Sequence, residues 1–189
     1  MTSNIRGILL AAGQSSRFGS NKLLHPLGNG KTIIEQSADN LFKACPDSIA
    51  VISKQSLKLT ELLSNTDLTI IENTQAENGI GSSIACGVHA ATDADGWLIA
   101  LADMPFIDNR IMQKIMQGMG KTKCIIAPSH NQQRGHPVLF SKHFYEQLSQ
   151  LNSDIGARDI IKNNLDKLKL IEIDDTAIFR DIDVFSDLT

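Results

Sequence analysis

Residues 9–22 read Leu-Leu-Ala-Ala-Gly-Gln-Ser-Ser-Arg-Phe-Gly-Ser-Asn-Lys, and this stretch decides the fold of the chain. It extends an apolar run that begins at Ile5 and then changes to small and polar residues. Small side chains let backbone amides approach phosphate oxygens, while Arg17 and Lys22 supply positive charge. We therefore expect a β-strand over Ile5 to Ala11, followed by a loop that binds phosphate.

Similar apolar runs recur along the chain and alternate with amphipathic stretches. The further expected strands are Ile49 to Ile52, Leu68 to Ile71, Trp97 to Ala102, Cys124 to Ala127, Val138 to Phe140 and Leu168 to Ile173. Apolar residues recur at three and four, as in helices, over Ile33 to Ala44, Leu57 to Leu63, Ser82 to Ala91, Arg110 to Gln117, Lys142 to Leu151 and Ala157 to Leu165. Strands and helices that take turns over most of the chain predict parallel strands joined by right-handed crossovers. The expected fold class is α/β: one domain over residues 1–189, with a doubly wound, mostly parallel sheet in a three-layer αβα arrangement.

The composition excludes several functional classes. The formal net charge is −3, and the lysines and arginines are scattered, so the broad basic surface of a nucleic-acid-binding protein is missing. The first apolar run is too short for a signal peptide or a membrane span, so we expect a cytoplasmic protein with no membrane partner. The three cysteines have no metal-ligand or redox spacing and are interpreted as free buried thiols.

The loop after the first strand differs from the two commonest nucleotide-binding loops. A Walker loop has four residues between its glycines, followed by Lys-Ser or Lys-Thr, whereas five residues separate Gly13 from Gly19 here. There is also no G-x-G-x-x-G sequence, which disfavours a dinucleotide-dependent oxidoreductase. A simple surface turn would explain the glycines but not the nearby Arg17 and Lys22, so we favour a nucleotide-binding function.

Asp103 follows a strongly apolar strand, within residues 98–105, which read Leu-Ile-Ala-Leu-Ala-Asp-Met-Pro. Ligands of open α/β sheets bind beyond the carboxyl ends of the strands, and magnesium prefers one or two carboxylates together with water and substrate phosphates. Capping of the next helix is the alternative role, but Asp108 and Asn109 lie closer to that helix. Asp103 is therefore a candidate magnesium ligand.

Three further segments carry groups suited to binding. Residues 78–85 open a helix with Gly81 and Ser82 and would leave free amides at its start, although many helices begin in this way. Residues 134–136, Arg-Gly-His, precede a strand and could bind an anionic or heterocyclic substrate. Residues 154–158 read Asp-Ile-Gly-Ala-Arg, in which Asp154 is interpreted as a helix cap with no catalytic role.

Taken together, these motifs and their order resemble those of the MobA-like NTP transferases over nearly the whole chain. The signature is Leu-Ala-Ala-Gly-x-Ser-x-Arg-Phe-Gly-x-x-Lys-Leu-Leu from Leu10 to Leu24, and Leu-Ala-Asp-Met-Pro at residues 101–105 also matches. Within that family, the Arg-Gly-His-Pro string makes the chain most similar to the molybdenum cofactor cytidylyltransferases. This resemblance implies a Rossmann-like nucleotidyltransferase fold and transfer of CMP from CTP to a molybdopterin phosphate, with release of pyrophosphate.

The resemblance also implies roles for individual residues. Those expected to bind the nucleotide are Leu10, Ala11, Ala12, Gly13, Arg17, Lys22, Gly81 and Ser82. Those expected to act in catalysis are Arg17, Lys22 and Asp103, and those expected to bind the acceptor are Arg134, Gly135 and His136. Magnesium is the implied cofactor, held by Asp103 and Asp183. Val184 and Phe185 replace the family's usual Thr-Pro after Asp183, so a solvated acidic turn is an equal alternative for that residue.

More than one interpretation of the substrates is open. In the resembling family, alanine at the position of Ala12 accompanies cytidine use and glycine accompanies guanosine use, but one methyl group gives only ~1–3 kcal/mol of discrimination. The alternatives are a guanylyltransferase, a transferase for a sugar or polyol phosphate, and a non-catalytic chaperone that binds a nucleotide or pterin cofactor. A downstream molybdoenzyme or its chaperone is a candidate protein partner.

Overall fold

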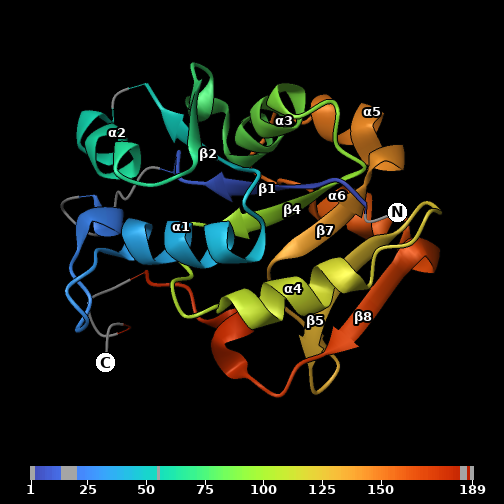
Figure 1. The fold of residues 1–189 in the computed structure, drawn as a ribbon. Coiled ribbons are helices and arrows are strands. Elements are labelled where there is room, and N and C mark those ends of the chain that lie inside the picture. Colours follow the sequence, from blue (N-terminus) through green and yellow to red (C-terminus); the bar gives the residue numbers. More distant parts are fainter. Residues whose placement is uncertain (1–2, 14–20, 55, 184–186, 188–189) are drawn as a thin grey trace.

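The structure, a computed structural model, describes residues 3–13, 21–54, 56–183 and 187. At its centre lies an eight-stranded sheet in the order β3-β2-β1-β4-β7-β5-β6, with β8 paired to the remaining edge of β5 (Figure 1). The strands are β1 (Ile5–Leu10), β2 (Ser48–Ser53), β3 (Thr69–Asn73), β4 (Gly96–Leu101), β5 (Ile125–His130), β6 (Gln133–Arg134), β7 (Val138–Ser141) and β8 (Leu168–Glu172). In the described residues, no helix has the length and apolar content needed to cross a membrane.

Helices cover both faces of this sheet. They are α1 (Ile33–Ala44), α2 (Leu57–Ser64), α3 (Ile80–Ala90), α4 (Asn109–Gln117), α5 (Tyr145–Ser149) and α6 (Arg158–Lys162). Successive residues of a strand point to opposite faces, so Leu9 packs in one core with α1, α2 and α4, whereas Ile8 and Leu10 pack in another with α3, α5 and α6. The predicted three-layer architecture is therefore confirmed.

The parallel part of the sheet also agrees with the prediction. β1 pairs in parallel with β2 and β4, and β2 pairs in parallel with β3. The sheet is mostly parallel, as predicted, but β7 runs antiparallel to both β4 and β5. No helix separates β5 from β7, so the chain returns as a hairpin through Asn131 and Gln132, which have positive φ, and a parallel crossover cannot form.

Two predicted helices are divided in the structure. The stretch expected as one helix over residues 142–151 contains the 3-10 helix η3 (Lys142–Phe144) followed by α5, and residues 157–165 contain α6, with η4 (Leu165–Lys167) beginning at their end. Apolar residues three apart fit a 3-10 turn as well as an α-helix, so the apolar spacing alone did not distinguish them. The helix predicted to begin at Ser82 begins at Ile80, after Gly79 with φ +96°.

Candidate active site

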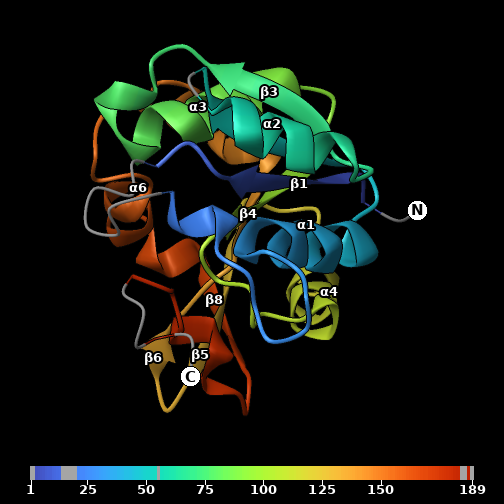
Figure 2. The same cartoon turned by 90° about the vertical axis from the view of Figure 1, so that its left-hand side faces the viewer.

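The carboxyl ends of β1 and β4 bring two of the predicted motifs together. Leu10 pairs with Leu101 in the parallel register, and the Ala102 amide donates to the Leu10 carbonyl over 3.1 Å. The segments containing Gly13 and Asp103 therefore leave the sheet next to each other, on the side of the molecule that faces the viewer in Figure 2. This is the edge at which ligands of open α/β sheets bind.

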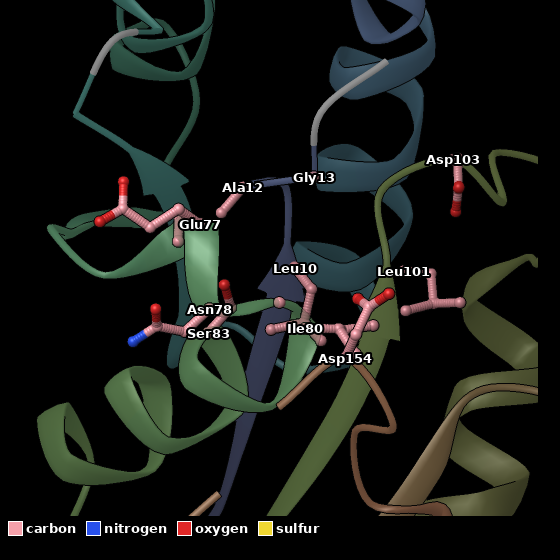
Figure 3. A pocket seen from close by; sticks show the side chains of 12 residues that line it. Leu10, Ala12, Gly13, Glu77, Asn78, Ile80, Ser83, Leu101, Asp103 and Asp154 are labelled. Carbon is pink, nitrogen blue, oxygen red and sulfur yellow. The ribbon is translucent and has the colours of Figure 1, made fainter. Parts of the chain in front are cut away.

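A pocket of about 490 Å³ opens at this edge. Figure 3 shows the side chains that line it, from the end of β1, the start of α3, the end of β4 and the segment before α6. The lining residues are Leu10, Ala12, Gly13, Ala76, Glu77, Asn78, Gly79, Ile80, Ser83, Leu101, Asp103 and Asp154. A smaller cavity of about 200 Å³ shares Leu10, Gly13 and Asp103 with it and is bordered by Ala11 and Lys22. The volume of the first pocket is typical of a small-molecule site.

Lys22 borders the smaller cavity together with Asp103. Its ammonium group donates to Asp103 Oδ2 over 2.9 Å and to Asp183 Oδ1 over 2.7 Å, and only 14% of its side chain is exposed. Burial disfavours the charge, but the hydrogen bonds to Asp183 and Asp103 outweigh burial and raise the pKa of Lys22. Lys22 therefore stays protonated at neutral pH. Arg17, the other predicted triphosphate ligand, lies outside the described residues.

Carboxylates from two distant parts of the chain converge around this ammonium group. Oxygens of Asp103, Asp181 and Asp183 all lie within 4.8 Å of one another. The Ile182 amide donates to the Asp103 carbonyl over 2.9 Å, which fastens the C-terminal segment to the end of β4. Burial raises the pKa of Asp181, and the nearby charges of Asp183 and Asp103 raise it further. A set of closely spaced carboxylate oxygens is suited to a hard divalent cation, so these residues fit the implied magnesium ion.

Asp103 does not cap α4, the helix that follows it. Asp108 is the N-cap of α4, and its side chain accepts a hydrogen bond from the Ile111 amide over 3.0 Å. Asp103 has no part in that cap, and its side chain is free to face Lys22 and the pocket. The prediction that a residue nearer the helix would cap it is confirmed.

The Gly81 amide and the Ser82 hydroxyl are both used in hydrogen bonds within the protein. The Gly81 amide donates to the Ser153 carbonyl over 2.8 Å, and the Ser82 hydroxyl donates to the carbonyls of Gln75 and Gly79. Neither is among the residues that line the pocket, whereas Gly79 and Ser83 are. The serines do not cap α3, because its N-cap is Gly79 and no side-chain cap bond forms.

The Arg134 to His136 string reaches the same edge because β7 is antiparallel. Val138 pairs with Ile99 of β4, so the residues just before β7 lie beside the carboxyl end of β4. The His136 amide donates to the Ile178 carbonyl over 3.0 Å, in the 3-10 helix η5 (Thr176–Phe179), which leads to the C-terminal carboxylates. A Cβ atom on Gly135 would lie 2.5 Å from the Ile178 carbonyl oxygen, so this close packing requires glycine.

The His136 side chain is largely buried, and the charges of Arg134 and Asp103 affect its pKa. Burial lowers its pKa, the charge of Arg134 lowers it further, and the charge of Asp103 acts in the opposite direction. Its Nδ1 atom is buried and has no hydrogen-bond partner in the described part of the chain. The imidazole is therefore mainly neutral at pH 7, and its Nδ1 atom retains an unused capacity for one hydrogen bond.

Several residues at the site were not predicted as site residues. Asp181 lies two residues before the predicted ligand Asp183 and was not itself predicted; its pKa is raised by burial first and then by the charges of Asp183 and Asp103. Asp154 was interpreted as a helix cap, but α6 begins after Ala157 without a side-chain cap, and Asp154 lines the pocket instead. The Asp-x-Gly-Ala-Arg motif around it was the available signal. Asn78 begins the segment 78–85 but was assigned no role there, and Glu77 carried no distinguishing pattern.

Comparison with known proteins gives consistent matches over nearly the whole chain. Residues 7–168 match the model of the MobA-like NTP transferase domain. The molybdenum cofactor cytidylyltransferase of Escherichia coli (strain K12) is 31% identical over 181 residues, covering 95% of this chain and 91% of that protein. Nicotine blue oxidoreductase of Paenarthrobacter nicotinovorans is 26% identical over 188 residues, covering 95% and 92%. The solved manganese complex of Rv0371c from Mycobacterium tuberculosis H37Rv is similar with a TM-score of 0.79 at 21% identity, covering 98% of this chain and 96% of that chain.

Proposed function

Because this chain belongs to the MobA-like NTP transferase family, we propose that it transfers CMP from CTP to the terminal phosphate of a molybdopterin-type acceptor. Nucleotidyl transfer follows from the family, whereas the base, the acceptor and the metal are the proposed parts. The observation that carries the proposal is the convergence of Gly13, Lys22 and the Asp103 cluster at one edge of the sheet.

The nucleotide is proposed to lie in the pocket between the end of β1 and the start of α3. Leu10, Ala11, Ala12 and Gly13 would contact the base and the sugar-phosphate through their small side chains and backbone. Gly81 and Ser82 would act by fixing the start of α3, since their polar groups bond to Ser153, Gln75 and Gly79. Arg17 is retained as a triphosphate ligand on the family resemblance alone.

In the reaction, an oxygen of the acceptor phosphate attacks the α-phosphorus of CTP, and the bond to the β-phosphate oxygen breaks to release pyrophosphate. The attacking phosphate is already ionised near neutral pH, so no general base is needed. Positioning and charge neutralisation account for the catalysis. Lys22 is placed to offset negative charge on the transferred group and the leaving pyrophosphate.

Magnesium is proposed to bind at Asp103 and Asp183, with Asp181 as an additional candidate ligand. Such an ion would neutralise charge on the α- and β-phosphates. The spacing of the three carboxylates supports this assignment, and the manganese complex of a structural relative is in keeping with a divalent cation. Because Lys22 pairs with two of these carboxylates, we expect its ammonium group to shift toward the phosphates when nucleotide and metal enter together.

The assignment is tested by measuring pyrophosphate release from CTP with magnesium and a molybdopterin acceptor. We expect Asp103→Asn to lower turnover by roughly 10²-fold or more without unfolding the protein, as loss of a transition-state charge partner does. Lys22→Met should both weaken CTP binding and slow transfer. Asp174→Asn is the control, because that carboxylate is fully exposed, lies 3.9 Å from His130 Nδ1 and is not among the residues that line the pocket. An unimpaired Asp103→Asn enzyme would refute the metal assignment.

The same assay separates the other candidate functions. A guanylyltransferase releases pyrophosphate faster from GTP, and a sugar or polyol phosphate transferase does so with those acceptors. A cofactor chaperone binds CTP but releases no pyrophosphate. The relative named as an oxidoreductase makes a redox activity a further alternative, which would also release no pyrophosphate.

A further inference from the structure

Asp154 places a carboxylate in the wall of the main pocket. It lies in the turn before α6, whose N-cap is Ala157 and has no side-chain cap bond. Figure 3 shows the Asp154 side chain directed into the pocket, with its carboxylate between Leu10 and Leu101. Within the described residues, this carboxylate makes no hydrogen bond or ion pair. Its capacity to accept hydrogen bonds is therefore available to a ligand.

The backbone around Asp154 is packed directly against the start of α3. The Gly81 amide donates to the Ser153 carbonyl over 2.8 Å. A Cβ atom on Gly79 would lie 2.6 Å from the Asp154 Cα atom, so the backbones at these two positions are in close contact. Gly79 and Asp154 both line the pocket. The position of the carboxylate in the pocket wall is thus determined by the packing of two segments that are distant in sequence.

The negative charge of Asp154 restricts which part of a nucleotide it can contact. An ionised carboxylate repels phosphate groups and can only accept hydrogen bonds. Lys22 and Asp103 border the smaller cavity, whereas Asp154 lines the larger pocket and not that cavity. With the triphosphate and the metal near Lys22 and Asp103, the nucleoside lies in the larger pocket beside Asp154. Its hydrogen-bond donors are the ribose hydroxyls and the amino group of the base.

Of these donors, the ribose hydroxyls match the Asp154 carboxylate best. The ribose of any nucleotide lies between the phosphates and the base. Figure 3 shows Asp154 between Asp103, which is proposed to bind the metal, and Ala12, which is proposed to face the base. The two neighbouring hydroxyls also offer two donors to two carboxylate oxygens, whereas cytosine carries a single amino group.

We propose that the Asp154 carboxylate accepts hydrogen bonds from the 2′- and 3′-hydroxyls of the nucleotide and thereby selects ribonucleotides. Asp154 is then the specificity-determining residue for the sugar, as Ala12 is proposed to be for the base. The same hydrogen bonds orient the nucleoside so that its α-phosphate lies toward Asp103. This inference rests on the proposed function for the identity of the ligand as a nucleoside triphosphate.

CTP and 2′,3′-dideoxy-CTP, each with magnesium, are the probes that test the proposal without turnover. Calorimetry on the full chain should show that the wild-type protein binds the dideoxy nucleotide about tenfold more weakly or worse, because hydrogen bonds to a charged group are lost. Asp154→Ala should bind CTP about tenfold more weakly than the wild type and bind the two nucleotides with similar affinity. Asp154→Asn, which preserves the shape of the side chain, should reduce the discrimination in the same direction.

Asp159→Ala is the matched control for Asp154→Ala. Asp159 is an exposed carboxylate of α6 and is not among the residues that line the pocket. This variant should keep the wild-type ratio of the two affinities. Because the readout is a ratio of two ligands on one protein, a general loss of stability does not produce the expected result.

Equal affinities of the wild-type protein for CTP and 2′,3′-dideoxy-CTP would overturn the proposal, as would the wild-type ratio in Asp154→Ala. A change confined to the ratio of CTP to UTP, or to the KM for the acceptor, would also overturn it and assign the carboxylate to the base or the acceptor. If the wild-type chain releases no pyrophosphate, the proposed function fails, but the two nucleotide titrations still decide on Asp154. A protein that prefers another base is titrated with the ribose and dideoxy forms of that nucleotide.

Discussion

Lys22 supplies the positive charge at the point where three carboxylates of the chain meet. Its ammonium group bonds to Asp103 and Asp183, which lie far apart in sequence. Mutual repulsion among Asp103, Asp181 and Asp183 would otherwise disfavour this packing of the C-terminal segment on β4. A single lysine thus stabilises the free site and, in the proposed reaction, becomes available to the phosphates of the nucleotide.

His136 predicts a measurable dependence of stability on pH. Its folded-state pKa is lowered by burial first and by Arg134 second, so the unfolded chain binds the proton more readily. The stability due to the neutral imidazole is fully present above the unfolded pKa of about 6.5 and is lost as the pH falls toward the lower folded value. Between about pH 7 and pH 5, the Tm of the wild-type protein should fall more steeply than that of His136→Gln.

Thermal unfolding followed by circular dichroism across this pH range checks the prediction. His143→Gln serves as the control, because His143 is exposed and lies in η3, away from the site. The control should keep the wild-type slope. Parallel curves for the wild type and His136→Gln would show that burial of the imidazole does not contribute to the acid sensitivity.

At the scale of elements, the start of α3 depends on its close packing against residues 151–154. A Cβ atom on Gly81 would lie 2.6 Å from the Ser153 carbonyl oxygen, which accepts the Gly81 amide hydrogen bond. We expect Gly81→Ala to destabilise the protein by ~1–3 kcal/mol, because a backbone atom must move to relieve the clash. The Tm should fall by about 2–4 °C per kcal/mol in a chain of this size.

Gly28→Ala provides the comparison for this substitution. A Cβ atom at Gly28 would meet nothing within 4 Å, and its φ is not in the left-handed region. Differential scanning calorimetry should therefore show little change for Gly28→Ala. Since α3 borders the pocket, Gly81→Ala should also raise the KM for the nucleotide; an unchanged Tm together with an unchanged KM would argue against the packing role.

At the scale of the whole molecule, the main pocket is lined by segments from distant parts of the chain. Loops after β1 and β4, the start of α3 and the segment before α6 all line the main pocket. CTP with magnesium should raise the Tm more than GTP or ATP does at equal concentration. A ligand at a hundred times its Kd stabilises by about 2.7 kcal/mol, or roughly 5–10 °C here.

The methyl group of Ala12 is the proposed cause of this preference. It is buried and faces the pocket, where it would reduce the room for a purine. A thermal-shift series on Ala12→Gly should bring the response to GTP closer to the response to CTP, by up to ~1–3 kcal/mol. Equal shifts for all three nucleotides in the wild-type protein would remove base selection from the proposed function.

The amino-acid sequence alone was sufficient to predict the parallel half of the sheet and the places of Lys22 and Asp103 after strands of that sheet. Buried strands and amphipathic helices are encoded locally by apolar spacing, and the residues that follow a strand must lie at its carboxyl end. The direction of β7 was not encoded in this way, because a short apolar run is equally compatible with a hairpin and with a crossover.

Only the tertiary structure determined which distant groups become neighbours. The meeting of Asp181 with Asp103 and the position of His136 beside β4 depend on the C-terminal segment and on the antiparallel return of the chain in β7. Charge interactions act through space and follow no periodicity along the chain. For this reason local patterns identified individual site residues, whereas their electrostatic coupling required the folded molecule.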